Sequence, residues 1–174
     1  ASIEKIYDVD EHIGCATSGL VADARILVDE ARKNAQVHKI TYGENISVEM
    51  LVKKICDYKQ NYTQYGGARP FGTAILMAGI DDMGISLFET DPSGALVSYK
   101  ATCIGSGRPA VMDVFEKEYQ DGMECVDALK LGLKALGSAL EEKPVAASVE
   151  IGVVETGKKF RRLSEEEISD LLKE

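Results

Sequence analysis

Residues 15–25, CATSGLVADAR, mark the point where a predicted strand turns into a predicted helix. The small residues at 17–19 favour a tight turn, because hydroxyl side chains compete for backbone groups and Gly19 permits a turn that a side chain would obstruct. Apolar residues then recur at helical spacing, and Asp23 falls in the first turn, where the helix dipole favours a carboxylate. The segment therefore predicts a strand–turn–helix corner, with the helix over residues 20–38.

The segments on either side of this corner complete the first half of the prediction. Upstream, short apolar runs around Ile6 and Ile13 suit strands with one buried face. Downstream, Ser47 is a good N-cap for a second amphipathic helix, whose inward positions include Ile55 and Lys59. This helix must end near the two glycines at 66–67.

The second half of the chain predicts strands, two helices, strands and a last helix. Residues 73–80 form a short apolar run that suits a strand buried on both faces, and residues 91–94 (DPSG) suit a type I turn in a hairpin. Pro109 near the start of a third helix and Ser164 before a terminal helix are typical of helix N-termini. A short hairpin across residues 156–157 precedes that terminal helix. The inward positions expected are Val111, Val114, Phe115 and Tyr119 on the third helix, and Cys125, Ala128, Leu129, Leu133, Leu136 and Leu140 on a fourth helix over residues 124–140.

Composition restricts the class of protein. With 174 residues, 45% hydrophobic and 28% charged, the chain predicts one globular α+β domain spanning residues 1–174. A net charge of −9 disfavours nucleic-acid partners. No apolar run is long enough to span a bilayer, and no secretory signal is visible, so no membrane role is expected. The four cysteines lack zinc-ligand spacing and predict free thiols in a reducing cytoplasm, with no metal and no cofactor.

No catalytic motif emerges from the residues. The two histidines, His12 in a predicted strand and His38 near a helix end, sit in no recognisable motif. Residues 105–107 (GSG) lack the spacing of a nucleophile elbow or a phosphate-binding loop. Ala1 offers no nucleophilic side-chain atom at the first position.

Five strings resemble one family across essentially the whole chain. SIEKI at 2–6, TSGLVADAR at 17–25, YTQYGGARPFG at 62–72, DPSGAL at 91–96 and YKATCIGSG at 99–107 are similar to the α subunits of the proteasome core particle, the archaeal type above all. The resemblance implies the four-layer αββα sandwich of N-terminal-nucleophile hydrolases. It also implies that this sequence lacks a gating tail, an N-terminal helix and the first two strands, and is therefore N-terminally truncated.

The resemblance implies a structural role within a threonine-type endopeptidase complex. Such α subunits form homo-heptameric outer rings that gate entry, template assembly and stack on catalytic β subunits. They dock the C-terminal tails of regulatory ATPases and admit unfolded protein substrates, in the cytoplasm. The alternatives are an active N-terminal-nucleophile hydrolase, against which Ala1 argues, and a stand-alone α+β binding module.

The resemblance also assigns roles to individual residues. Lys5, Gly19, Leu20 and Val21 correspond to the pocket between adjacent α subunits that receives an activator's C-terminal tail. Tyr65, Gly67 and Arg69 correspond to a loop near the pore and the neighbouring subunits. Without the resemblance, Lys5 would be a solvated strand lysine, residues 19–21 a turn and part of the core, and residues 65–69 a helix C-terminal turn with an exposed cation.

Overall fold

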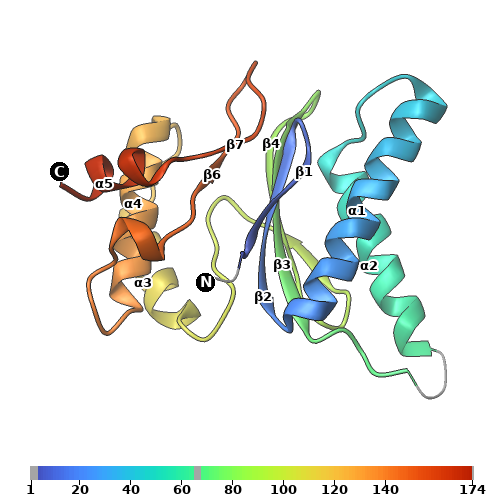
Figure 1. Ribbon diagram of the computed structural model, residues 1–174, viewed down its shortest axis with the longest axis horizontal. Coiled ribbons are helices and arrows are strands. Elements are labelled where there is room, and N and C mark those ends of the chain that lie inside the picture. The colour runs from blue at the N-terminus through green and yellow to red at the C-terminus, as the bar shows by residue number, and fades with distance from the viewer. Residues whose placement is uncertain (1–3, 65–67, 174) are drawn as a thin grey trace.

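A computed structural model describes residues 4–64 and 68–173 and shows four layers (Figure 1). Helices α1 (Val21–Tyr42) and α2 (Val48–Gln64) cover one face of a five-stranded antiparallel sheet. Its strands, in spatial order, are β1 (Ile6–Asp10), β2 (Ile13–Gly19), β3 (Thr73–Asp81), β4 (Gly84–Thr90) and β5 (Leu96–Ser98). The α+β, αββα arrangement implied by the sequence is confirmed.

The other two layers lie across the free face of that sheet. A two-stranded sheet pairs β6 (Gly152–Val153) with β7 (Arg161–Arg162). Outside it lie α3 (Arg108–Glu118), α4 (Cys125–Ser138) and α5 (Glu165–Lys173), with a short 3₁₀ turn, η1 (Ala146–Ser148), before β6 (Figure 1). None of the helices in the described residues is long and apolar enough to cross a membrane.

Local sequence signals account for the element ends. Helix α1 ends at Tyr42, four residues beyond the predicted end at residue 38, and Gly43 closes it with φ +68°. Ser47 caps α2 by accepting a hydrogen bond from the Met50 N–H, as predicted. Ser164 and Glu167 exchange side-chain and backbone hydrogen bonds at the start of α5, which forms a capping box. His12 is a correction, because it lies in the β1–β2 turn rather than in a strand.

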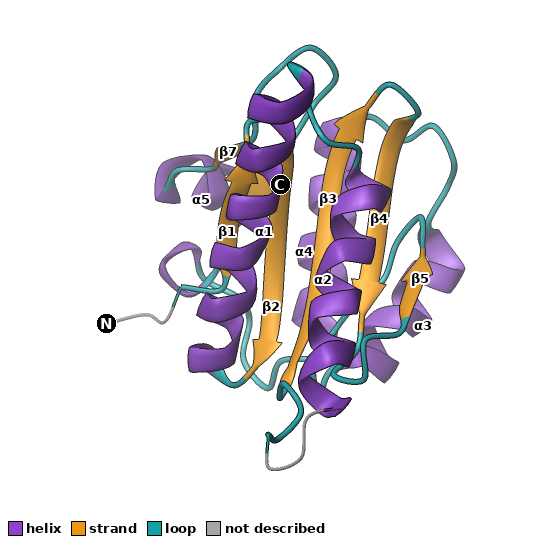
Figure 2. Ribbon diagram, turned by 90° about the vertical axis from the view of Figure 1, so that its right-hand side faces the viewer, coloured by secondary structure: helices purple, strands orange, loops and turns teal. Residues whose placement is uncertain are grey.

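Helices α1 and α2 lie over one face of the sheet (Figure 2), and the buried apolar core fills the space between them and the sheet. Ile13 and Ile75 from the sheet and Leu27 and Leu51 from the helices are at most 1% exposed. Strand β3 alternates between buried residues facing these helices and half-buried residues facing the other way. The prediction that β3 is buried on both faces was therefore wrong, because its second face borders a groove that remains open.

The same groove explains why the expected inward faces of α3 and α4 are only partly confirmed: Val111 and Leu133 are buried as predicted, and the other expected positions are not. On α4, Leu131, Leu133 and Ala135 are buried, whereas Leu136 is exposed. The remaining expected positions on α4 are half-buried (Cys125, Leu129) or exposed (Ala128, Leu140), and on α3 only Val111 is buried. Periodicity finds an apolar stripe, but burial requires a layer packed against it. The stripe of α4 borders a groove of about 630 Å³ between this helix and the sheet.

A buried ammonium group joins α2 to the end of the sheet where β3 begins and β4 ends. Lys59 is 0% exposed, and its Nζ donates to the Thr73 carbonyl at 3.0 Å, the Thr90 hydroxyl at 2.8 Å and the Asp91 carbonyl at 3.1 Å. Burial lowers the pKa of Lys59 to about 8. Three acceptors match the three ammonium protons, so the charge is tolerated in the interior at a cost in solvation.

We expect Lys59→Met to destabilise the chain by about 1–3 kcal/mol at pH 8, because three buried acceptors lose their donor. The loss should increase by about 1–2 kcal/mol between pH 8 and pH 10. In that range the folded protein has released the Lys59 proton and the unfolded chain still holds it, so deprotonation stabilises the wild type alone. Urea unfolding across this pH range measures both effects.

Lys54→Met is the matched control, because Lys54 is exposed on the same helix. The other titrating groups cancel when each variant is compared with wild type at the same pH. A Lys59→Met difference that stays constant from pH 8 to pH 10 would contradict the assignment.

Candidate functional site

The site begins at the corner where β2 meets α1. Gly19 has φ +114°, and a Cβ added there would lie 2.1 Å from the Gly72 carbonyl oxygen. That oxygen accepts a hydrogen bond of 2.9 Å from the Leu20 N–H, and the Thr73 hydroxyl donates to the Leu20 carbonyl at 3.1 Å. Only glycine allows the two backbone segments to approach this closely. The tight turn predicted at Gly19 is therefore confirmed.

Asp23, in the first turn of α1, holds the segment that faces this corner. Its Oδ2 accepts from Arg69 Nη1 at 2.6 Å and from the Gly72 N–H at 2.8 Å, and its Oδ1 accepts from Arg69 Nη2 at 2.8 Å. The hydrogen bonds from Arg69 hold the pKa of the Asp23 carboxyl below its usual range, although burial acts in the opposite direction. Bidentate arginine–carboxylate pairing fixes orientation as well as charge.

Lys5 lies at the same end of the sheet, beside β2. Its carbonyl accepts from the Thr17 N–H at 3.0 Å, and its own N–H donates to Glu150 Oε2 at 3.0 Å. The side chain borders the groove between the sheet and α4. Within residues 4–64 and 68–173, no acceptor pairs with its ammonium group. Lys5 is therefore fixed through its backbone, and its ammonium group is suited to binding an anionic group.

The structure brings four of the candidate residues to one end of the sheet. Leu20 is 52% and Val21 41% exposed, so their apolar side chains are available beside Gly19, at the end of the sheet where Lys5 precedes β1. Their expected part in a buried core, the reading without any resemblance, is therefore wrong. Arg69 joins this corner through Asp23, and its side chain is 62% exposed. Tyr65 and Gly67 lie outside the described residues.

Two residues of the corner were not predicted as part of the site. Asp23 was interpreted only as a carboxylate near the helix dipole, and Gly72 was given no role. Each lies in one of the most specific strings, GLVADAR and YTQYGGARPFG, but nothing in a single sequence shows that two residues 49 positions apart share a hydrogen bond. Their presence in those strings was the only available signal.

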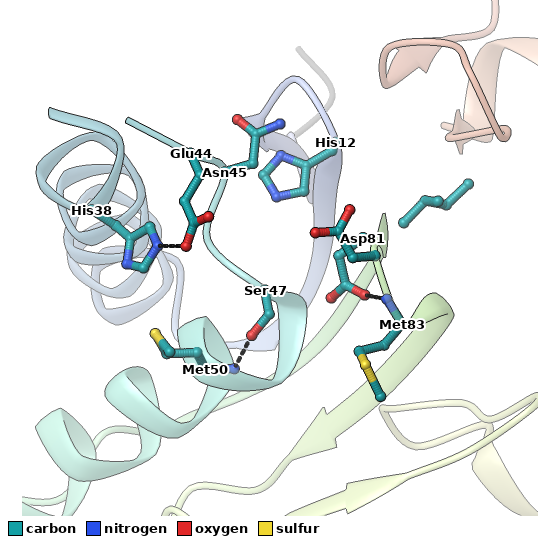
Figure 3. Close-up of a pocket in the computed structure, with 10 residues that line it drawn as sticks. His12, His38, Glu44, Asn45, Ser47, Met50, Asp81 and Met83 are labelled. Atoms are coloured by element: carbon teal, nitrogen blue, oxygen red, sulfur yellow. Dashed lines mark hydrogen bonds and ion pairs between the residues drawn. The ribbon is translucent and has the colours of Figure 1, made fainter. Parts of the chain in front are cut away.

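A second hollow, a cleft of about 530 Å³, lies at the opposite end of the sheet (Figure 3). His12 Nε2 lies 2.7 Å from the Ile46 carbonyl, and His38 Nε2 lies 3.8 Å from Glu44 Oε1. The hydroxyl of Ser47 accepts from the Met50 N–H as the cap of α2. These contacts join a turn, a helix end and a helix start, and they place neither histidine against a nucleophile.

No group of three potential metal ligands occurs within residues 4–64 and 68–173. All four cysteines are free thiols, as predicted. Burial raises the pKa of Cys15 to about 12 and raises that of Cys56, so both remain protonated and unreactive at neutral pH.

Comparison with known proteins gives one family. The model of the family described as "Proteasome subunit" matches residues 1–154. A protein of Methanothermobacter thermautotrophicus named proteasome subunit alpha is 58% identical over 174 residues, which are 99% of this chain and 70% of the relative. Proteins of the same name from Methanosarcina acetivorans and Archaeoglobus fulgidus are 58% and 55% identical over 99% and 96% of this chain, and over 70% and 68% of their own length.

We expect Gly19→Ala to destabilise the chain by at least about 2 kcal/mol, because the new Cβ would collide with the Gly72 carbonyl in addition to straining the backbone. Gly84→Ala is the matched control. Gly84 has a similar φ of +104° with open space around its Cβ, so its loss should be about 1 kcal/mol. Urea unfolding compares the two variants, and equal losses would show that the close approach to Gly72 has no energetic weight.

Proposed function

The chain belongs to the proteasome subunit family, and we propose that it is an α-type subunit of a proteasome core particle, with a structural, gating and docking role. The observation that carries this proposal is 55–59% identity, over at least 96% of the chain, to archaeal proteins named proteasome subunit alpha. The αββα layers agree with it, because α-type subunits are expected to keep the sandwich of the catalytic ones.

In this proposal the chain contributes no catalytic residue of its own. Both histidines are engaged at element ends, where His12 meets the Ile46 carbonyl and His38 meets Glu44. The candidate tail-binding residues offer a cation and apolar side chains, which are binding groups. Peptide cleavage is then performed by β-type subunits in the same complex.

The partners follow from this role. We assign the chain to a homo-heptameric ring that stacks on β-type subunits, docks the C-terminal tails of regulatory ATPases and passes unfolded protein substrates. The cytoplasm is the proposed compartment, and four free thiols support it, because a reducing environment preserves them.

The corner at β2 and α1 suits a peptide that ends in a free carboxylate. The Lys5 ammonium, which has no acceptor within residues 4–64 and 68–173, supplies the opposite charge, and Leu20 and Val21 supply exposed apolar surface for the last side chains. Gly19 lets the Gly72 carbonyl pack against the turn, and this contact holds Leu20 in place at the corner. Tyr65, Gly67 and Arg69 are proposed to face the pore and the neighbouring subunits.

We expect native mass spectrometry to detect seven-membered rings of this chain, or stacked rings when its β-type partner is added. Head-to-tail contacts, in which one surface of each chain binds a different surface of the next, close into such a ring when the rotation between neighbours completes a circle. An archaeal protein named proteasome subunit alpha, of which this chain covers 70%, is the positive control for ring detection. If that control forms rings and this chain remains monomeric with and without its partner, the proposed function is wrong.

In the assembled particle, we expect Lys5→Ala to weaken binding of a fluorescein-labelled apolar peptide with a free C-terminal carboxylate by about 10- to 100-fold. This is the value of a charge-assisted hydrogen bond. Fluorescence anisotropy measures the change. The amide-capped peptide should bind weakly to both proteins, and Lys54→Ala, another exposed lysine, should bind like wild type. Equal binding of the free and capped peptides by wild type would contradict the role of Lys5.

A further inference from the structure

The exposed residues Leu20 and Val21 owe their position to a neighbouring segment, residues 69–73. Leu20 is held on both sides of its backbone, by its N–H to the Gly72 carbonyl at 2.9 Å and by its carbonyl to the Thr73 hydroxyl at 3.1 Å. A Cβ added to Gly72 would lie 2.8 Å from the Leu20 side chain. Small movements of residues 69–73 would therefore displace Leu20 directly.

Asp23 and Arg69 hold that segment to α1. The side chain of Asp23 is only 6% exposed, and among the described residues it accepts three hydrogen bonds, two from Arg69 and one from the Gly72 N–H. Removal of the guanidinium would leave a buried carboxylate with a single donor. The segment would then have to move to let water reach Asp23.

The far side of the segment has an independent anchor. Phe71 is 4% exposed, and its ring centroid lies 4.6 Å from that of Tyr62 and 5.7 Å from that of Tyr58, both on α2. The Thr73 carbonyl is also held by Lys59. Loss of the Asp23–Arg69 pair should therefore loosen the segment without unfolding it.

We propose that the Asp23–Arg69 pair is a positioning clamp that pre-forms the apolar half of the tail-binding corner by fixing Gly72 against Leu20. Arg69 acts through Asp23 and Gly72, and its guanidinium does not contact the bound tail. This inference rests on the proposed tail-binding function. It assigns to Arg69 a role distinct from that of Lys5, which supplies the charge for the carboxylate.

Arg69→Met in the assembled particle tests the clamp with the same labelled peptide. We expect binding to weaken by about two- to tenfold, in the range of coupling through packed networks. Arg161→Met is the matched control, because Arg161 is a half-exposed arginine paired with Glu167 elsewhere on the surface. That control should bind like wild type.

A double-mutant cycle separates positioning from contact. If Arg69 acts only through Asp23, Arg69→Met should cost little further affinity in an Asp23→Asn background. Hydrogen exchange at the Leu20 amide should become faster in Arg69→Met and remain slow in Arg161→Met. Arg69→Lys keeps one donor and should restore part of the affinity. If Arg69→Met fails to assemble, Arg69→Lys takes its place in the affinity measurement, the double-mutant cycle and the hydrogen-exchange experiment.

Each remaining outcome has a definite meaning. Additive losses in the cycle would overturn the clamp, because Arg69 would then contact the peptide. The clamp would also be overturned if both Arg69 variants bound the peptide with wild-type affinity and exchanged the Leu20 amide hydrogen at the wild-type rate. If Lys5→Ala still lost affinity for the peptide in the same experiment, the proposed function would stand. Absence of carboxylate-dependent binding in wild type would refute the tail-binding function and the clamp together.

Discussion

The antiparallel pairing of β2 with β3 fixes which residues meet at each end of the sheet. It runs without a break from Ile13↔Gly79 to Gly19↔Thr73. At one end it brings Gly19 to the segment that contains Gly72, and at the other it brings the Ile80 N–H to the His12 carbonyl. A slip of one residue would turn the buried residues of the strand that moves, Ile13 on β2 or Ile75 on β3, away from α1 and α2, and it would separate Leu20 from its partners. The core and the candidate site therefore depend on the same pairing.

Buried charges connect the helical layer to the sheet and its loops. Lys59 joins α2 to the start of β3 and to the turn after β4, and Asp23 joins α1 to residues 69–72. A buried charge requires its partners, so removing one partner is more harmful than replacing the whole group. Lys59 and Asp23 each satisfy most of their hydrogen-bonding capacity with residues far away in the sequence. These contacts specify where loops lie, which apolar packing alone does not.

The sequence predicted element type well and side-chain environment less well. Apolar spacing located α1 and α2, and it placed Lys59 on the inward face of α2, where it is buried. The same spacing was misleading for α4, because Leu136 belongs to the apolar stripe but borders a groove. The pairing of Asp23 with Arg69 could not be predicted either, since it joins residues 46 positions apart through a fold that only the three-dimensional structure defines.

The interactions that stabilise the core differ in kind from those that shape the corner. The core cluster consists of apolar side chains between α1, α2 and the sheet, and of the segment at the corner it includes only Phe71. The corner itself is held by local hydrogen bonds and by the pair that buried Asp23 forms with exposed Arg69, rather than by apolar packing. Substitutions at Lys5 or Arg69 can therefore change binding while the fold persists. The docking surface proposed at this corner would benefit from this arrangement, because its geometry can be adjusted without cost to the core.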